Sequence, residues 1–333
     1  MRTLAVSLVA LLLAAVAGAA FASGHVRTIA TFDPAAGQLP EGVAVDKRGN
    51  VFASFAPLGQ LVRFGPRSTE AEPFGSVPGI DAANGDLGLA GLAVDRRGDV
   101  YGAVISKVAG GIWRFDRTTG AAERLPGTEA IPFPNGLAFD RRGSLYVASS
   151  SEGKSPAGAL LGGIWRVSRD GSVERVLVDE ALGGEGVLLP TGIGANGIAV
   201  RRRVLYVTNS EKGTLLAIRV RRDGSLRTPR VVASGAQLES ADGLALDVRG
   251  NVYVAVIGQS TVVRVGRSGA ITPIADASDG LDWASSLAFG QSKGKRRVLY
   301  AVNFAIGPQF GAPPGAGPGL LTIRVGIPGR PLP

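Results

Sequence analysis

Two carboxylates and two carboxamides occupy equivalent positions of a phrase that this chain repeats. Six segments share a variable residue, then a glycine or serine, then three small or apolar residues, and four of them end on an aspartate. We call the variable residues the openers: they are Glu41, Ala90, Asn135, Asn196, Asp242 and Ser285. Carboxylate and amide oxygens are the ligands that hard divalent cations such as calcium take in proteins. If the openers lie on a ring, they form a candidate cation site.

The spacing of the openers predicts such a ring. Successive openers are 49, 45, 61, 46 and 43 residues apart. A repeat of about 40 to 50 residues made of several short strands is typical of a β-propeller blade. We therefore predict an all-β fold, a six-bladed β-propeller with four antiparallel strands per blade, in which the openers face one another across the central opening.

The strand pattern also predicts how the ring closes. Alternation and turn residues divide the first repeat into strands over 42–46, 50–55, 60–65 and 71–77, and the next four repeats divide similarly. The sixth repeat supplies only three strands, over 286–290, 298–304 and 319–325. The segment 26–32 resembles the outer strands of other repeats. We expect this N-terminal strand to complete the last blade and remove the open sheet edge.

The first 22 residues have the pattern of a secretory signal peptide. Arg2 precedes an apolar run from Leu4 to Ala17, and the segment ends on Ala20-Phe21-Ala22. We predict cleavage after Ala22 and a propeller domain over residues 23–333. The mature protein is expected to be secreted or periplasmic, and a monomer.

Two residue counts exclude several kinds of active site. The chain has no cysteine, and its only histidine is His25, just after the predicted cleavage site. A Ser-His-Asp triad, a Cys-His pair and a His-rich zinc site are therefore excluded. Hydrolysis would have to depend on carboxylates, a lysine or a bound metal.

Loop lengths separate the two faces of the predicted disc. The connections alternate between the faces, and the long ones over 78–89, 150–161, 179–195 and 305–318 all fall on one side, the long-loop face. The openers immediately precede the innermost strands and lie on that same side. Long glycine- and proline-rich loops on a rigid scaffold are where binding usually occurs.

The opposite face, the short-turn face, receives pairs of arginines such as Arg96-Arg97 and Arg141-Arg142, and the whole chain has a net charge of +9. A basic face can make weak contact with an anionic cell envelope, although solvated hairpin tips are the plainer interpretation. No aromatic residues are interleaved with these arginines, so we expect no nucleic-acid partner.

The residue pairs Glu41-Gly, Asn135-Gly, Asn196-Gly and Asp242-Gly, with the strand Leu-Tyr-Val-Thr-Asn-Ser at 205–210, resemble the senescence-marker-protein and gluconolactonase (regucalcin-like) family of six-bladed propellers. The resemblance implies that Glu41, Asn135, Asn196 and Asp242 bind a divalent cation, calcium in first place and zinc as the alternative. It also implies a hydrolase in which the cation polarises the carbonyl of a small lactone or ester, and the signal-peptide pattern predicts that this hydrolase is exported. Asp242 would then be the general base, and Glu41 a second catalytic carboxylate.

Four further residues are weaker candidates. Glu185 and Glu239, in or beside long-loop connections, are alternative bases, and Glu185 is also a candidate substrate contact. Lys107 could meet an anionic substrate, although a solvated lysine is the simpler interpretation. Trp283, in the loop that enters the sixth blade, is a candidate for lining a pocket.

A non-enzymatic function stays open at this point. Asn-Gly and Asp-Gly pairs form turns readily, so the polar openers could serve only to shape the chain. The protein would then be an extracellular propeller that binds a ligand, peptide or glycan through its long loops.

Overall fold

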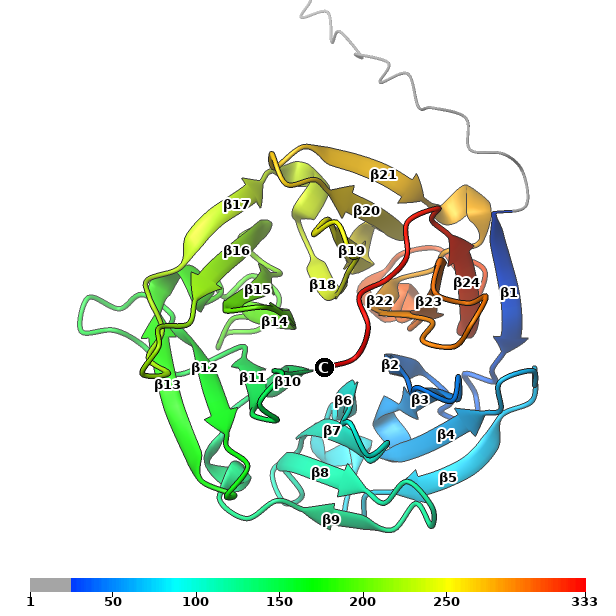
Figure 1. Ribbon diagram of the computed structural model, residues 1–333, viewed down its shortest axis with the longest axis horizontal. Helices are drawn as coiled ribbons and strands as arrows, with labels where there is room; N and C mark the ends of the chain where they lie inside the picture. The colour runs from blue at the N-terminus through cyan, green and yellow to red at the C-terminus, as the bar shows by residue number, and fades with distance from the viewer. Residues whose placement is uncertain (1–24) are drawn as a thin grey trace, which may run out of the picture.

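The computed structural model describes residues 25–333, and it confirms the predicted six-bladed propeller (Figure 1). Six antiparallel sheets of four strands each surround a central axis. The predicted signal peptide lies outside the described residues. Within the part that is described, no helix is long and apolar enough to cross a membrane.

In blades one to five the strands follow the chain from the axis outward, and in blade six the first strand of the chain, β1, is outermost. Blades one to three contain β2 (Pro40–Val45), β3 (Val51–Phe55), β4 (Gln60–Phe64), β5 (Glu72–Ser76), β6 (Gly88–Val94), β7 (Val100–Ile105), β8 (Gly111–Phe115), β9 (Ala122–Arg124), β10 (Pro134–Phe139), β11 (Leu145–Ser149), β12 (Gly162–Val167) and β13 (Val173–Asp179). Blades four to six contain β14 (Ala195–Arg201), β15 (Val204–Asn209), β16 (Thr214–Arg219), β17 (Arg230–Ser234), β18 (Ala241–Leu246), β19 (Val252–Val256), β20 (Thr261–Val265), β21 (Ile271–Ala275), β22 (Ala284–Phe289), β23 (Val298–Asn303), β24 (Gly319–Arg324) and β1 (Val26–Thr31).

Short 3₁₀ helices occur in the connections of the long-loop face. They are η1 (Ala56–Leu58), η2 (Ala82–Asn84), η3 (Thr128–Ala130), η4 (Glu180–Leu182), η5 (Ala236–Leu238), η6 (Ile257–Gln259), η7 (Ala277–Asp279) and η8 (Gly307–Phe310).

Strand β1 completes blade six, as predicted. It pairs antiparallel with β24, with Val26 opposite Ile323 and Thr31 opposite Gly319. In Figure 1 the blue β1 lies at the outer edge of the blade that contains the red β24. Segments from the two ends of the propeller thus share one sheet, and this pairing closes the ring without a disulfide.

The core lies between neighbouring blades. Phe52 and Leu61 of blade one, for example, pack with Leu89 and Phe115 of blade two, and all four side chains are almost fully buried. Burial of one such side chain contributes about 1.5 to 3 kcal/mol of stability. Because every blade is packed on both sides, the position of each inner strand is fixed by its two neighbours.

Each inner strand contains a β-bulge at its opener. The register shifts between residues 40 and 43, 89 and 92, 134 and 137, 195 and 198, 241 and 244, and 284 and 286. The openers therefore lie inside the strands, and the glycines that follow five of them do not have a positive φ. The interpretation of Asn-Gly and Asp-Gly as turns is wrong, because here the pair makes a bulge, which redirects a side chain.

The glycine after each opener lets two blades approach closely. A Cβ atom on Gly42, Gly91, Gly136, Gly197 or Gly243 would lie 2.4 to 2.7 Å from the backbone oxygen of the next blade's opener. No real Cβ contact is that short, so only glycine allows this spacing. The sixth copy has Ser286 instead, and its hydroxyl accepts a hydrogen bond from the Val43 N–H at 3.3 Å.

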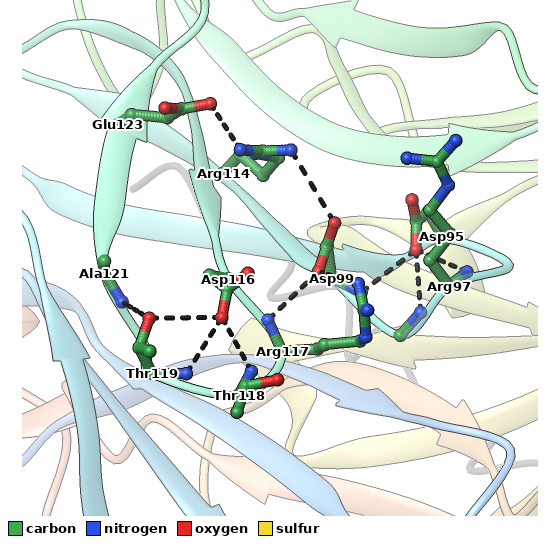
Figure 2. A network of polar contacts seen from close by, with 11 residues as sticks. Asp95, Arg97, Asp99, Arg114, Asp116, Arg117, Thr118, Thr119, Ala121 and Glu123 are labelled. Atoms are coloured by element: carbon green, nitrogen blue, oxygen red, sulfur yellow. Dashed lines mark hydrogen bonds and ion pairs between the residues drawn. The ribbon is translucent and has the colours of Figure 1, made fainter.

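The aspartates that end four of the phrases cap the hairpins of the short-turn face. Asp95 Oδ1 accepts hydrogen bonds from the N–H groups of Arg97, Gly98 and Asp99 (Figure 2). Asp99 is itself buried and forms ion pairs with Arg114 and Arg117. The repeated aspartate therefore has a structural role, on the face opposite the openers.

Residues 325–333 close the axis on the short-turn face. After β24 the chain runs inward to the centre of the ring, where Figure 1 marks the C-terminus. The Arg330 N–H donates to the Leu246 carbonyl at 2.8 Å, and the Leu332 N–H donates to the Gln291 side chain at 3.0 Å. This segment and all six inner strands line an apolar cavity of about 170 Å³.

We predict that Gly197→Ala lowers the free energy of unfolding by about 1 to 3 kcal/mol, because the new methyl group overlaps the Asp242 backbone oxygen. Gly266→Ala is the matched control, since a Cβ there meets nothing closer than 3.6 Å. Thermal unfolding of both variants measures the difference. Equal midpoints for the two variants would contradict the role of the glycine in blade spacing.

Candidate metal centre

The four predicted ligands line one small cavity at the axis. Glu41, Asn135, Asn196 and Asp242 surround a space of about 50 Å³, together with Ser285 and the residues that follow the openers. They come from β2, β10, β14 and β18, the inner strands of four different blades. A cavity of this size has room for a cation and a few water-sized ligands.

Apolar side chains form the floor of this cavity. The residues two positions after the openers are Val43, Leu92, Leu137, Ile198, Leu244 and Leu287. Five of these six residues also line the apolar cavity of about 170 Å³ on the short-turn side. They therefore separate the polar cavity at the openers from the rest of the axis. These side chains exclude water from one side of the polar cavity and lower the local dielectric constant. Electrostatic interactions inside the cavity are therefore stronger.

Hydrogen bonds orient the two carboxamides. Asn196 Nδ2 donates to the Ser210 hydroxyl at 3.0 Å, and that hydroxyl donates to the Ala241 carbonyl at 2.7 Å. Asn135 Nδ2 has a longer contact of 3.4 Å with Ser150, whose hydroxyl donates to the Ala195 carbonyl at 2.7 Å. The amide nitrogens are engaged in this way, and the amide oxygens remain available to a cation.

Glu41 has a buried oxygen without a partner. The residue as a whole is partly exposed, but its Oε2 atom is buried and makes no hydrogen bond. A buried carboxylate oxygen without a partner destabilises the folded state, because ionised carboxylates are stable in an interior only when they are paired or bind a metal. Burial and then the negative charge of Asp242 raise the pKa of Glu41 well above its usual value.

Asp242 is the second buried carboxylate of the cavity, with 6% of its surface exposed. Burial raises the pKa of Asp242 to about 7, although the Asn196 side chain and the Gly243 N–H act in the opposite direction. The two carboxylates therefore repel each other and are poorly solvated. A bound divalent cation would compensate both effects.

The donor set fits a hard cation. The described residues contain no cluster of three or more His, Cys, Asp or Glu side chains, so a site of the usual zinc type is not present in this part of the chain. Two carboxylates and two carboxamides supply oxygen only, which calcium prefers. The unpartnered Glu41 oxygen is the observation that the cation would explain.

The weaker candidates lie outside this cavity. Lys107 is exposed, and its Nζ donates to the Asn84 carbonyl at 2.9 Å. Glu185 and Glu239 are also exposed and do not line the cavity. Trp283 stacks on Phe310 with ring centroids 5.4 Å apart and packs over Gly307. The structure thus brings the four predicted ligands together around one cavity and leaves the weaker candidates in the surrounding loops.

Two kinds of residue near the site were not identified from the sequence. Ser150 and Ser210, which orient the carboxamides, directly follow the second strands of their blades and end the matching phrases Leu-Tyr-Val-Ala-Ser-Ser and Leu-Tyr-Val-Thr-Asn-Ser. That recurrence is the available signal. The role of Glu211 leaves no such pattern in the sequence.

The Glu211 carboxylate organises the loop between blades three and four. It accepts hydrogen bonds from the N–H groups of Glu185, Gly186, Leu188 and Ile193 at 2.5 to 3.0 Å. Burial alone would raise the pKa of Glu211, but these backbone hydrogen bonds lower it below its usual value. Because Glu211 directly follows Ser210, the same strand end holds both this loop and the Asn196 amide.

Solved structures share this fold. A gluconolactonase from Xanthomonas campestris is 19% identical, with a TM-score of 0.64 and coverage of 92% of this chain and 89% of that chain. A calcium-binding regucalcin from Agrobacterium tumefaciens is 17% identical, with a TM-score of 0.62 and coverage of 89% and 93%. The pyrroloquinoline-quinone-bound aldose sugar dehydrogenase from Streptomyces coelicolor is 18% identical, with a TM-score of 0.62 and coverage of 90% and 96%. At these identities the likeness establishes the fold alone.

No sequence match is found among curated proteins. The model of the SMP-30/Gluconolactonase/LRE-like region matches residues 91–301, which is more than half of the chain and includes three of the four candidate ligands. The match agrees with the propeller fold. This chain therefore belongs to the SMP-30/gluconolactonase/LRE-like family.

Proposed function

We propose that this protein is a divalent-cation-dependent hydrolase of lactones or esters. Membership of a family named after gluconolactonase supports hydrolysis of this kind. The observation that carries the metal dependence is the buried, unpartnered Glu41 Oε2 beside a second buried carboxylate. A propeller that used its polar openers only to shape the chain would have no need for this costly arrangement.

Glu41, Asn135, Asn196 and Asp242 would hold the cation, and calcium suits this oxygen-only set better than zinc. When bound, the cation supplies a positive charge that polarises the carbonyl of the substrate. The serine hydroxyls behind the carboxamides bind the amide nitrogens, so the amide oxygens stay available to the cation. The site is thus assembled before any substrate arrives.

Asp242 is the group placed to accept a proton from the attacking water. Its carboxylate is buried above an apolar floor, which makes it a stronger base than a solvated aspartate. Its orientation is supported by Asn196 and by the Gly243 N–H. Glu41 would contribute the second negative charge of the site.

The size of the cavity limits what can enter it. A space of about 50 Å³ admits a carbonyl group but not a whole lactone ring with substituents. The remainder of the substrate would therefore lie above the openers, among the long-loop connections. We also propose that the protein acts outside the cytoplasm, which the signal-peptide pattern of residues 1–22 supports.

The first prediction concerns catalysis. Asp242→Asn keeps the shape of the side chain but removes the base and one ligand charge, so we expect kcat/KM for a lactone panel to fall by at least about 100-fold. Glu239→Gln, in an exposed loop residue, is the control and should keep full activity. Chelation should abolish the activity of the unchanged protein, and calcium should restore it.

Activity that survives both chelation and Asp242→Asn would contradict the proposed mechanism. Calorimetry of calcium binding tests the proposed cation site separately from the proposed hydrolysis. Calcium binding without turnover of any lactone or ester would reject the hydrolase and leave a cation-binding propeller that recognises a ligand through its loops.

The second prediction concerns pH. A carboxyl group whose pKa is higher in the folded state than in the unfolded state destabilises the fold as pH rises from its unfolded pKa to its folded one. The metal-free protein should therefore lose stability between about pH 4 and pH 7, by roughly 4 kcal/mol at most from Asp242. Asp242→Asn should flatten this loss.

Thermal unfolding in chelator across this pH range measures the effect. Calcium should raise the midpoint far more at pH 7.5 than at pH 4.5, since protonated carboxyl groups are poor ligands. A calcium shift that is the same at both pH values would contradict the assignment of these carboxylates as ligands.

A further inference from the structure

The two faces of the propeller have opposite charge. In the described chain, the hairpin connections of the short-turn face contain twenty Lys and Arg residues against nine Asp and Glu residues. The connections of the long-loop face contain twelve Asp and Glu residues, three lysines and no arginine. The connections of the short-turn face thus have a net charge of +11, and those of the long-loop face have a net charge of −9.

The backbone of the turns engages most of the acids of the short-turn face. Eight of the nine accept hydrogen bonds from backbone N–H groups, as Asp95 and Asp116 do in Figure 2. Of the twenty cations in these connections, Arg117 is the one that forms an ion pair among the described residues. The remaining cations face solvent without an acidic partner.

The positive charge continues to the centre of this face. Arg330 reaches the axis through the hydrogen bonds of its backbone to Leu246 and Gln291. Arg141 and Arg202 lie just beyond the ends of β10 and β14, the inner strands that converge there, and Arg201 is the last residue of β14. Burial and then the charges of these three arginines lower the pKa of Arg330.

The shape and chemistry of this face fit an extended planar anion. The propeller is thinnest along its axis, so the short-turn face is a broad side of the disc, and every blade contributes cations to it. Val248 is the one large apolar side chain exposed in its turns, and it offers little for insertion into a bilayer. Apolar loop residues that are more exposed than Val248, such as Val108, Val187 and Phe310, lie on the opposite face.

We propose that the short-turn face docks peripherally on an anionic lipid bilayer, through phosphate headgroups, and holds the opener cavity away from the membrane. The attraction is electrostatic, and each Arg or Lys near such a surface strengthens it. The acidic long-loop face is repelled by the same surface, so one orientation is favoured. This inference does not depend on the proposed hydrolase activity.

Vesicle flotation of the full propeller tests the proposal. The protein should float with vesicles of phosphatidylcholine mixed with phosphatidylglycerol, should not float with phosphatidylcholine alone, and should dissociate as salt is raised. The triple variant Arg48→Gln, Arg142→Gln, Arg249→Gln changes exposed turn tips of blades one, three and five. It should bind the anionic vesicles on the order of 100-fold more weakly.

The matched control removes the same charge from the other face. Lys107→Gln, Lys154→Gln, Lys212→Gln should bind as the unchanged protein does, and Arg-to-Lys changes at the three turn tips should also keep binding. An equal loss of vesicle binding in both triple Gln variants would mean that only the net charge of the protein matters, and it would overturn the proposal. Equal binding to neutral vesicles, or tight binding to duplex DNA without binding to vesicles, would overturn it as well.

Discussion

The close approach of neighbouring inner strands is the constraint on which the rest of the structure depends. A glycine at the bulge of one blade touches the backbone oxygen of the next blade's opener, and five of the six junctions repeat this contact. The contact sets the radius of the ring, and the bulge directs the opener side chains to the axis. The pairing of β1 with β24 completes the circle, so that no blade can move outward on its own.

A ring of this radius creates an electrostatic problem at its centre. Glu41 and Asp242 are brought together above an apolar floor, where water cannot solvate them, and both pKa values rise. Nearby, Asn135 and Asn196 are held by serine hydroxyls with their amide nitrogens engaged. Four residues with oxygen donors thus line one small cavity, where a bound positive ion would reduce the repulsion. Stability and the proposed function are linked here, because a bound cation would offset the destabilisation that burial of the two carboxylates causes.

The repeats made the architecture predictable, and the openers made the polar cavity at the axis predictable. A strand phrase that recurs every 43 to 61 residues fixes the number of blades, and equivalent positions in a ring must converge. The bulge at each opener was not predicted, because Asn-Gly and Asp-Gly are locally consistent with a turn and only the neighbouring blade decides between the two. Glu211 and residues 325–333 act through hydrogen bonds to distant segments, which leave no periodic signal in the sequence.

The central claim is that oxygens from four blades bind one divalent cation at the axis. A crystal structure of the protein grown with calcium, with anomalous scattering data, tests it most directly. The account predicts an anomalous peak about 2.3 to 2.6 Å from oxygens of Glu41, Asn135, Asn196 and Asp242. A cavity that holds only water while calcium is present, or a peak elsewhere on the long-loop face, would contradict it.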